Sequence, residues 1–201
     1  MLSILRFFLN KKEEVKFMST NTIFVPINIA IVTISDTRIL NNDKSGDVLE
    51  ERVLKSNHKI ISRDIVKDNF DEIYKLFSNL INNEKIDAII STGGTGLTGS
   101  DITPEVMQTL FEKTIDGFGE MFRSLSFKKI GTSSLQSRAI AGVSNGTYIF
   151  CLPGSPSACL DGWDQILIHQ LDIRHKPCNF VEIMPRLEEH KLSRKKINGK
   201  F

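Results

Sequence analysis

The chain is poor in cysteine and has no recognisable metal-binding pair of residues. Its 201 residues include four histidines and three cysteines, Cys151, Cys159 and Cys178. An odd number of cysteines without a CxxC pair argues against a disulfide framework and a zinc knuckle, and the histidines form no HExxH pair. We therefore expect reduced thiols and a cytoplasmic protein.

Long apolar runs and a strong net charge are also absent. No stretch reaches the roughly 20 apolar residues that cross a bilayer. The apolar run at residues 5–9 is interrupted by an arginine and lacks the other features of a signal peptide. Because the formal net charge is only +2, the composition gives no case for nucleic acid or a membrane surface as a partner.

The length and composition indicate one globular domain. An apolar fraction of 40% is sufficient for a full core in a chain of this size. We expect a loose N-terminal extension at 1–27, an α/β domain at 28–180 and a polar, basic C-terminal tail at 181–201. Solvation of an exposed terminus explains the basic residues of the tail most simply.

Apolar runs alternate with segments of helical spacing along the predicted domain. Residues 29–34 are β-branched and almost wholly apolar, which is typical of a strand covered on both faces. The alternation predicts a mainly parallel sheet with helices on both faces. Further strands are expected at 59–66, 86–91 and 148–152, and helices at 47–55, around 73–81, after Pro104, at 120–127 beyond a glycine break at 117–119, and from 156 to about 171.

Polar turns follow three of the predicted strands. The first turn comprises Ser35, Asp36 and Thr37, the second is the loop 92–101, and the third includes Pro153, Gly154 and Ser155. Since the carboxyl ends of parallel strands share one edge of the sheet, and ligands bind there, we expect the three turns to meet. The first and third turns are interpreted either as anion-binding segments or as simple turns and helix caps.

The loop 92–101 is the most informative segment. Its glycines let backbone N–H groups approach a ligand, and the helix that follows favours phosphate at its N-terminus. A tight turn without a ligand is the alternative, but the hydroxyls and Asp101 favour a ligand. A GxGxxG pattern is present, yet its position after the third strand argues against NAD, and no GxxxxGKS/T motif occurs. The expected ligand-binding residues of the loop are Thr92, Gly93, Gly94, Thr95 and Gly96.

Two carboxylates are candidates for catalysis and metal binding. Asp68 and Asp101 each follow one predicted strand and precede one predicted helix. Such oxygen ligands suit Mg²⁺, which keeps several waters and bridges to substrate phosphates. Helix capping is the alternative role for both. Ser137 and Arg138 place a hydroxyl beside a guanidinium that suits phosphate, with an exposed ion pair as the alternative.

Together these motifs resemble the MoaB/MogA family of molybdenum cofactor biosynthesis proteins, over roughly residues 28–180. Plant and animal molybdopterin adenylyltransferase domains share the pattern. The segments that carry the resemblance are TGGTG at 92–96, DITPE at 101–105, SRA at 137–139 and PGSP at 153–156. Segments similar to the MoaB branch in particular are 117–123, 130–138 and 177–180.

The resemblance implies a three-layer, doubly wound α/β fold, a trimeric or hexameric homo-oligomer and binding of molybdopterin. Active members of the wider family transfer AMP from MgATP to the terminal phosphate of molybdopterin and release pyrophosphate. Carried over by motif, Asp68 and Asp101 would position Mg²⁺ and the triphosphate, and residues 93–96 would cradle the ligand. Ser155 would hold the pterin-side phosphate, and the turn 35–37 would line the same pocket.

Three functions follow as hypotheses. The first is an ATP-dependent molybdopterin adenylyltransferase. The second is a non-catalytic carrier that binds molybdopterin or a precursor, and the third is a scaffold subunit with the same fold. Because carboxylates stand at both Asp68 and Asp101, the sequence favours the enzyme.

Overall fold

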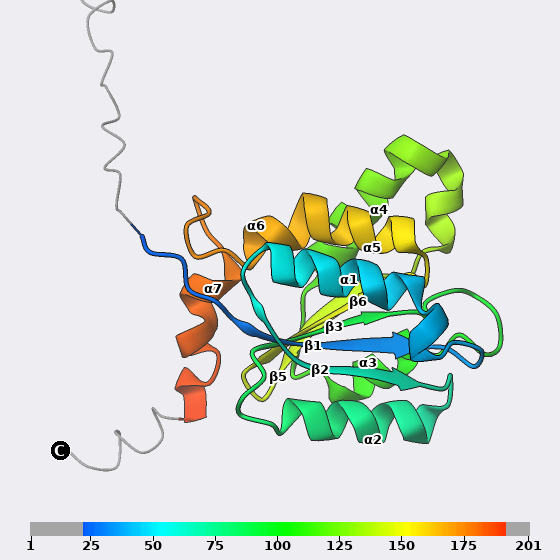
Figure 1. Ribbon diagram of the computed structural model, residues 1–201, viewed down its shortest axis with the longest axis horizontal. Helices are drawn as coiled ribbons and strands as arrows, with labels where there is room; N and C mark the ends of the chain where they lie inside the picture. Colours follow the sequence, from blue (N-terminus) through cyan, green and yellow to red (C-terminus); the bar gives the residue numbers. More distant parts are fainter. Residues whose placement is uncertain (1–21, 192–201) are drawn as a thin grey trace, which may run out of the picture.

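One six-stranded sheet organises residues 22–191, the part of the chain that the computed structural model describes (Figure 1). The strand order is β2-β1-β3-β6-β5-β4. The first four strands in this order are mutually parallel, whereas β5 and β4 are antiparallel to their neighbours. The prediction of a mainly parallel sheet is therefore confirmed. The strands are β1 (Asn28–Ile34), β2 (Lys59–Val66), β3 (Ala88–Thr92), β4 (Lys113–Thr114), β5 (Ile140–Ser144) and β6 (Thr147–Leu152).

Helices cover both faces of the sheet, as predicted. One face carries α1 (Lys44–Lys55), α4 (Asp116–Ile130), α5 (Pro156–Gly162) and α6 (Ile168–Gln170). The opposite face carries α2 (Phe70–Ile81) and α3 (Thr103–Leu110). The shorter segments are η1 (Leu40–Asn42), η2 (Gly131–Gln136), the π-helical η3 (Trp163–Leu167), α7 (Phe180–Ile183) and η4 (Met184–Arg186). No helix within residues 22–191 has the length and apolar character needed to cross a membrane.

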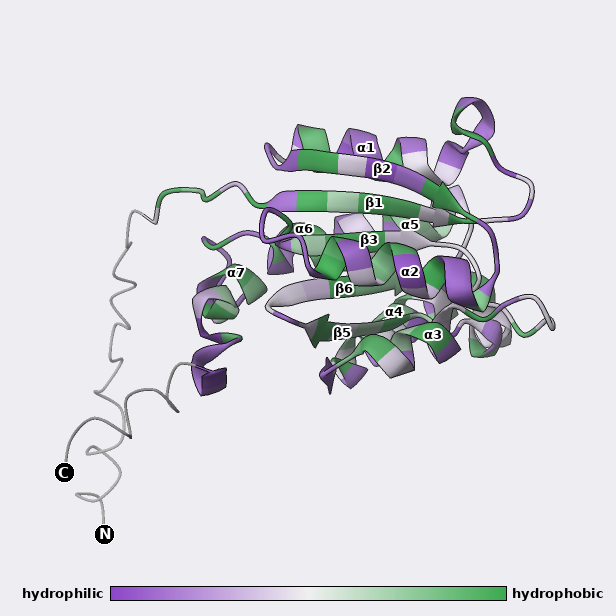
Figure 2. Ribbon diagram, turned by 90° about the horizontal axis from the view of Figure 1, so that it is seen from below, coloured by the Kyte–Doolittle hydropathy of each residue, from purple (hydrophilic) through white to green (hydrophobic). Residues whose placement is uncertain are grey.

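Strand β1 explains why the sequence shows an unbroken apolar run. Ile29 and Ile31 pack into the core beneath α1 and α5, whereas Ala30 and Val32 pack into the core beneath α2 and α3. Successive side chains of a strand point to opposite faces, so a strand between two helical layers needs apolar residues at every position. Figure 2 shows β1 and β3 in the interior of the sheet and β2 at its edge.

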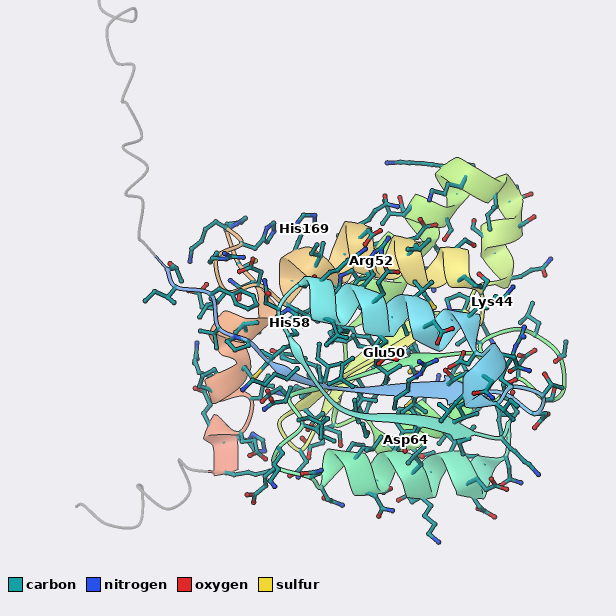
Figure 3. All side chains as sticks on the ribbon, in the orientation of Figure 1. Lys44, Glu50, Arg52, His58, Asp64 and His169 are labelled. Carbon is teal, nitrogen blue, oxygen red and sulfur yellow. The ribbon has the colours of Figure 1, made fainter. Side chains whose placement is uncertain are left out.

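The edge strand β2 is correspondingly more polar. Figure 3 shows Asp64 of β2 on the side of the sheet that faces α2, and Glu50 of α1 on the opposite side. Arg63, the residue next to Asp64, donates to Glu50 and to the buried carboxylate of Asp43. Because successive side chains of β2 point to opposite faces, Arg63 forms its ion pairs on the α1 side. These pairs lie at the edge of the sheet, where it meets solvent.

Two predicted helix boundaries were wrong. Helix α1 begins at Lys44 rather than at residue 47, because the carboxylate of Asp43 accepts a hydrogen bond from the Gly46 N–H at 3.0 Å and caps the helix there. Helix α4 runs without interruption through the predicted break at 117–119. Glycine in a helix interior costs only about 1 kcal/mol, and burial of Phe118 against the sheet offsets that cost.

Strand β5 was not predicted. Its sequence, IAGVS, is short and contains a glycine, so it carries little strand signal of its own. It forms an antiparallel hairpin with β6 through a turn in which Asn145 and Gly146 both have positive φ. This pairing extends the sheet beyond the parallel strands.

Packing continues beyond both predicted domain boundaries. Ile27 is buried, and its N–H donates to Nδ1 of His58 at 3.2 Å. At the other end Val181 is buried in the core, and Met184 and Leu187 pack against it. The rest of the predicted extension and tail, residues 1–21 and 192–201, lies outside the described residues.

Candidate functional site

A cavity of about 710 Å³ opens where the carboxyl ends of β1, β3 and β6 meet. The chain runs from β1 to β2 on one side and then crosses to β3 on the other, so the strand order reverses at this point, where α/β proteins bind ligands. All three predicted turns contribute to its wall. The predicted residues that line the cavity are Ser35, Thr37, Gly93, Gly94, Thr95, Gly96, Asp101, Ser137, Pro153, Gly154 and Ser155.

The glycine loop depends on two positions that exclude any side chain. Gly93 has φ +106°, and a Cβ there would lie 2.1 Å from the Ile34 carbonyl oxygen. Gly94 has φ +62°, and its Cβ would lie 2.2 Å from Oγ1 of Thr103. The Gly93 N–H donates to the Leu152 carbonyl at 3.0 Å, which fixes the loop against the end of β6. The loop is therefore rigidly placed with its backbone at the cavity wall.

Thr92 lies beneath the loop instead of in the cavity. Its side chain is fully buried, and its hydroxyl donates to the Pro153 carbonyl at 2.9 Å. The thiol of Cys159 contacts the same hydroxyl at 3.2 Å, and burial raises the pKa of Cys159 to about 11. Thr92 therefore joins the second and third turns, and Cys159 is a thiol of low reactivity beneath them.

Asp68 is held in an environment that opposes its ionisation. Its Oδ1 atom is buried and has no hydrogen-bond partner. Burial raises the pKa of Asp68 to about 6, and the charges of Asp36 and Asp101 act in the same direction. Capping is not its role, because Asn69 caps α2 by accepting from the Glu72 N–H at 3.1 Å. An unpaired buried carboxyl oxygen suits a cation or a proton.

The surroundings of Asp101, in contrast, favour its ionised form. Its carboxylate accepts hydrogen bonds from the hydroxyl of Thr98 at 2.5 Å and from the backbone N–H of Thr98 at 2.9 Å. The hydroxyl contact, more than any other interaction, lowers the pKa of Asp101. No side chain caps α3, so Asp101 is not a helix cap either. It stays ionised at the cavity wall.

Asp68 and Asp101 are the carboxylates next to the glycine loop that could hold Mg²⁺. Residues 22–191 contain no cluster of three or more His, Cys, Asp or Glu side chains arranged to hold a metal ion. Asp68 and Asp101 interact electrostatically with each other, and one of them has an unpaired buried oxygen. Two carboxylates fit an ion that takes its remaining ligands from water and substrate phosphates, which is the usual mode of Mg²⁺ binding.

Arg138 is directed into the loop instead of the cavity. Its Nε donates to the Gly96 carbonyl at 2.7 Å, its Nη2 donates to the Asp101 carbonyl at 2.7 Å, and its Nη1 pairs with Glu105. The ion-pair alternative for this residue is therefore observed. The guanidinium ties the glycine loop to the segment that enters β5, which positions Asp101.

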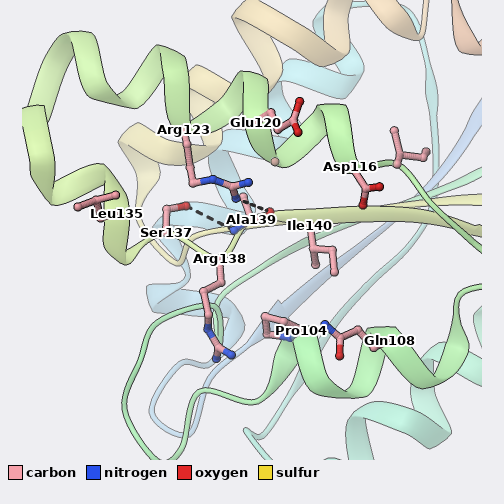
Figure 4. A pocket seen from close by; sticks show the side chains of 12 residues that line it. Pro104, Gln108, Asp116, Glu120, Arg123, Leu135, Ser137, Arg138, Ala139 and Ile140 are labelled. Carbon is pink, nitrogen blue, oxygen red and sulfur yellow. Dashed lines mark hydrogen bonds between the residues drawn. The ribbon is translucent and has the colours of Figure 1, made fainter.

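A second cavity, of about 520 Å³, lies on the other side of Arg138, between α3 and α4 (Figure 4). Arg123 of α4 extends across it and donates from Nη1 to the Ala139 carbonyl at 3.2 Å. Figure 4 shows the Arg138 side chain directed away from Arg123. The segment from Ser137 to Ala139 thus separates the two cavities.

Two other predicted residues have local structural contacts. Oδ1 of Asp36 accepts from the Asp68 N–H at 3.2 Å, and Asp36 lines a separate groove along β2. The hydroxyl of Ser155 caps α5 by accepting from the Ala158 N–H at 3.2 Å, although Ser155 also lines the main cavity. The cap and the cavity position are compatible, because a hydroxyl can accept one hydrogen bond and donate another.

Several cavity residues were not predicted. Arg38 directly follows the first turn, so a positive charge close to Ser35 in the sequence could have indicated an anion-binding residue. The others come from α4, η2 and α5, whose approach to the cavity is a tertiary feature. The unpredicted polar residues of the wall are Arg38, Ser126, Lys129, Ser133, Gln136, Ser157 and Asp161.

The fold and site together define a doubly wound α/β protein with a glycine loop, a hydroxyl-rich crevice and paired carboxylates at its topological switch point. Comparison with known proteins identifies the family. Residues 30–173 match the family described as "Probable molybdopterin binding domain". Molybdenum cofactor biosynthesis protein B of Escherichia coli (strain K12) is 46% identical over 160 residues, which cover 80% of this chain and 94% of that protein.

Two further relatives agree. The "Probable molybdopterin adenylyltransferase" of Methanocaldococcus jannaschii is 36% identical over 140 residues, covering 66% of this chain and 83% of that protein. A crystal structure of molybdenum cofactor biosynthesis protein B has a TM-score of 0.73 at 37% identity, covering 75% of this chain and 94% of that chain. The chain therefore belongs to the molybdopterin-binding family of molybdenum cofactor biosynthesis proteins, and the resemblance seen in the sequence is confirmed.

Proposed function

We propose that this protein binds molybdopterin and MgATP, transfers AMP to the terminal phosphate of molybdopterin and releases pyrophosphate, as a cytoplasmic enzyme. The observation that carries the proposal is the meeting of the glycine loop with two carboxylates. Asp101 lines the cavity, and Asp68 lies outside its lining but next to the loop, with its Oδ1 atom 2.4 Å from where a Cβ on Gly94 would be. A relative named as a probable molybdopterin adenylyltransferase supports the reaction type.

The chemistry requires positioning and neutralisation of charge. A phosphate oxygen of molybdopterin attacks the α-phosphorus of ATP, a new P–O bond forms, and the bond to the bridging oxygen breaks so that pyrophosphate leaves. The nucleophile is already ionised, so no general base is needed. The backbone N–H groups of Gly94 and Thr95 and the hydroxyls of Ser35, Ser137 and Ser155 would hold the phosphates in line, in a loop that Gly93 and Gly96 fix in place.

The carboxylates would hold the metal. Mg²⁺ bound by Asp68 and Asp101 would neutralise part of the triphosphate charge. Asp101 is ionised and oriented by Thr98, and Asp68 has a free buried oxygen. Cation binding would also relieve the mutual repulsion of the two carboxylates.

A homo-oligomer, a trimer or a hexamer, is part of the proposal. Helix α4 and the adjoining η2 expose four large apolar side chains, Met121, Phe127, Ile130 and Leu135, with exposed fractions of 53%, 57%, 56% and 78%. Exposed apolar residues gathered on one segment are typical of subunit contacts. Contact of this segment with another copy would bury them.

The test is incubation of the protein with molybdopterin and MgATP, followed by detection of AMP-molybdopterin and pyrophosphate. We expect both products from the wild type and neither from Asp101→Asn, whose circular dichroism spectrum should match the wild type. Tight binding of molybdopterin without product would support the carrier hypothesis instead. Full activity of Asp101→Asn would show that the central site has been misassigned.

A further inference from the structure

An ion pair crosses the wall of the main cavity between two helices. Lys129, in the last turn of α4, pairs through its Nζ with Oδ1 of Asp161 on α5. Both side chains line the cavity together with the glycine loop. Their pairing therefore takes place at the wall of the cavity that the ligand would occupy.

The two partners differ in how firmly they are held. The Asp161 side chain is only 13% exposed, and its Oδ1 also accepts from Nε2 of Gln165 at 3.2 Å. The Lys129 side chain is 57% exposed and carries its ammonium on a flexible four-carbon stem. The carboxylate is thus fixed, whereas the ammonium can turn towards another anion at little cost, since exposed ion pairs contribute little to stability.

The charges in the cavity give that ammonium another role. Among the described residues that line the cavity, the cationic side chains are Arg38 and Lys129, and the carboxylates are Asp101 and Asp161. In the proposed function Asp101 faces Mg²⁺, so Asp161 is the lining carboxylate that would repel the phosphates of a ligand, and one of the two cations of the lining is already paired with it. Phosphate carries more charge than a carboxylate and accepts stronger hydrogen bonds from an ammonium, so it competes well for Lys129.

The surroundings of Lys129 suit a phosphate. Ser126 lies one helical turn before it on α4, Ser133 lies just beyond it on η2, and Ser157 lies one turn before Asp161 on α5. All three hydroxyls line the same cavity. Hydroxyl donors around a lysine form a combination that binds phosphate oxygens.

We propose that Lys129 is a specificity-determining residue that binds a phosphate group of the substrate, and that Asp161 is its partner in the free protein and its competitor for that phosphate. The proposal rests on the proposed function and extends it: the α4 side of the cavity selects for a polyphosphate. Binding exchanges the Lys129–Asp161 contact for a Lys129–phosphate contact.

The test uses substitutions of opposite expected effect. Lys129→Gln should weaken binding of MgATP about tenfold, the effect of one charge-assisted hydrogen bond. Asp161→Asn should tighten it about threefold, because the competing carboxylate is gone. Lys129→Arg should restore most of the wild-type affinity. Isothermal titration calorimetry of the full chain at low salt measures each affinity, with MgATP, inorganic pyrophosphate and adenosine as probes.

Asp164→Asn is the matched control. Asp164 lies on η3, three residues beyond Asp161, and forms an ion pair with Arg52 of α1 at 2.8 Å, away from the cavity. Like the Lys129–Asp161 contact, this is an ion pair between two helices. Its loss should leave the affinities for MgATP, pyrophosphate and adenosine unchanged. Adenosine, which carries no phosphate, should bind Lys129→Gln and the wild type equally.

The outcomes separate the two proposals. If Lys129→Gln and Asp161→Asn change MgATP affinity in the same direction, or not at all, the ion pair only joins the helices and the inference is overturned. An equal loss of adenosine affinity in Lys129→Gln would overturn it too. If the wild type transfers AMP but the variants give either of these results, the proposed adenylyltransferase function stands and only the role of Lys129 is overturned. If the wild type neither binds MgATP nor forms product, both are overturned.

Discussion

Replacing Asp68 with asparagine removes a carboxylate whose ionisation at neutral pH lowers the stability of the folded protein. The pKa of Asp68 is raised from 3.8 to about 6, first by burial and then by the charges of Asp36 and Asp101. The difference between these two pKa values corresponds to about 3 kcal/mol in the free energy of unfolding of the ionised protein. Because the side chain is partly exposed, screening by solvent reduces the expected effect to about 1 kcal/mol. Asp68→Asn should therefore be more stable than the wild type at pH 7.5 without Mg²⁺.

The pH dependence has a definite sign. The folded protein holds the Asp68 proton more tightly than the unfolded chain, so the stability that this proton confers is present below pH 3.8 and is lost as the pH rises through about 6. The difference in melting temperature between Asp68→Asn and the wild type should be small at pH 4. It should reach roughly 2–4 °C above pH 7.

Asp101 should behave in the opposite way. Hydrogen bonds from Thr98 lower its pKa, so its ionised form stabilises the fold above its ordinary pKa, and that stability is lost as the pH falls through the lowered value. Asp101→Asn weakens these hydrogen bonds and should reduce stability at pH 7.5 by about 1 kcal/mol. Two neighbouring carboxylates of one site are thus expected to give stability changes of opposite sign.

Thermal melts followed by circular dichroism between pH 4 and pH 8 measure both effects. Glu120→Gln, which removes an exposed carboxylate of α4, is the control. Its melting temperature should equal that of the wild type at every pH. Addition of Mg²⁺ should raise the melting temperature of the wild type more than that of either variant, since both lack a metal ligand. If Asp68→Asn melts at or below the wild-type temperature at pH 7.5, Asp68 is not held ionised at a cost and the reasoning is wrong.

Three further predictions concern the loop and the surface. Gly94→Ala, at φ +62°, should destabilise the protein by at least about 2 kcal/mol and abolish ligand binding, whereas Gly99→Ala, with no atom within 4 Å of its Cβ, should be nearly neutral in urea melts. Arg138→Met should leave the loop open to limited proteolysis and lower turnover at least about tenfold, and unchanged cleavage and turnover would refute its positioning role. Phe127→Glu should dissociate the proposed homo-oligomer in light scattering; an unchanged mass would exclude Phe127 from the interface.

Local sequence patterns determined much of the fold. The apolar run at 29–34 indicated a strand between two helical layers, and β1 is that strand. The glycines after β3 indicated a loop whose backbone approaches a ligand, and Gly93 and Gly94 adopt conformations that a side chain would not allow. Hydrophobic period and glycine stereochemistry are properties of a few consecutive residues, so they can be read without the tertiary structure.

Only the tertiary structure decided how the site residues are used. Arg138 was a candidate phosphate ligand in the sequence, yet it supports the loop because Gly96 and Asp101 present carbonyl oxygens to its guanidinium. The sequence did not predict Lys129 and Asp161 as cavity residues, because their ion pair joins two helices that lie far apart in the sequence. The raised pKa of Asp68 likewise depends on burial and on carboxylates from two other segments. Charge interactions act through space, so the folded arrangement alone determines which group faces which.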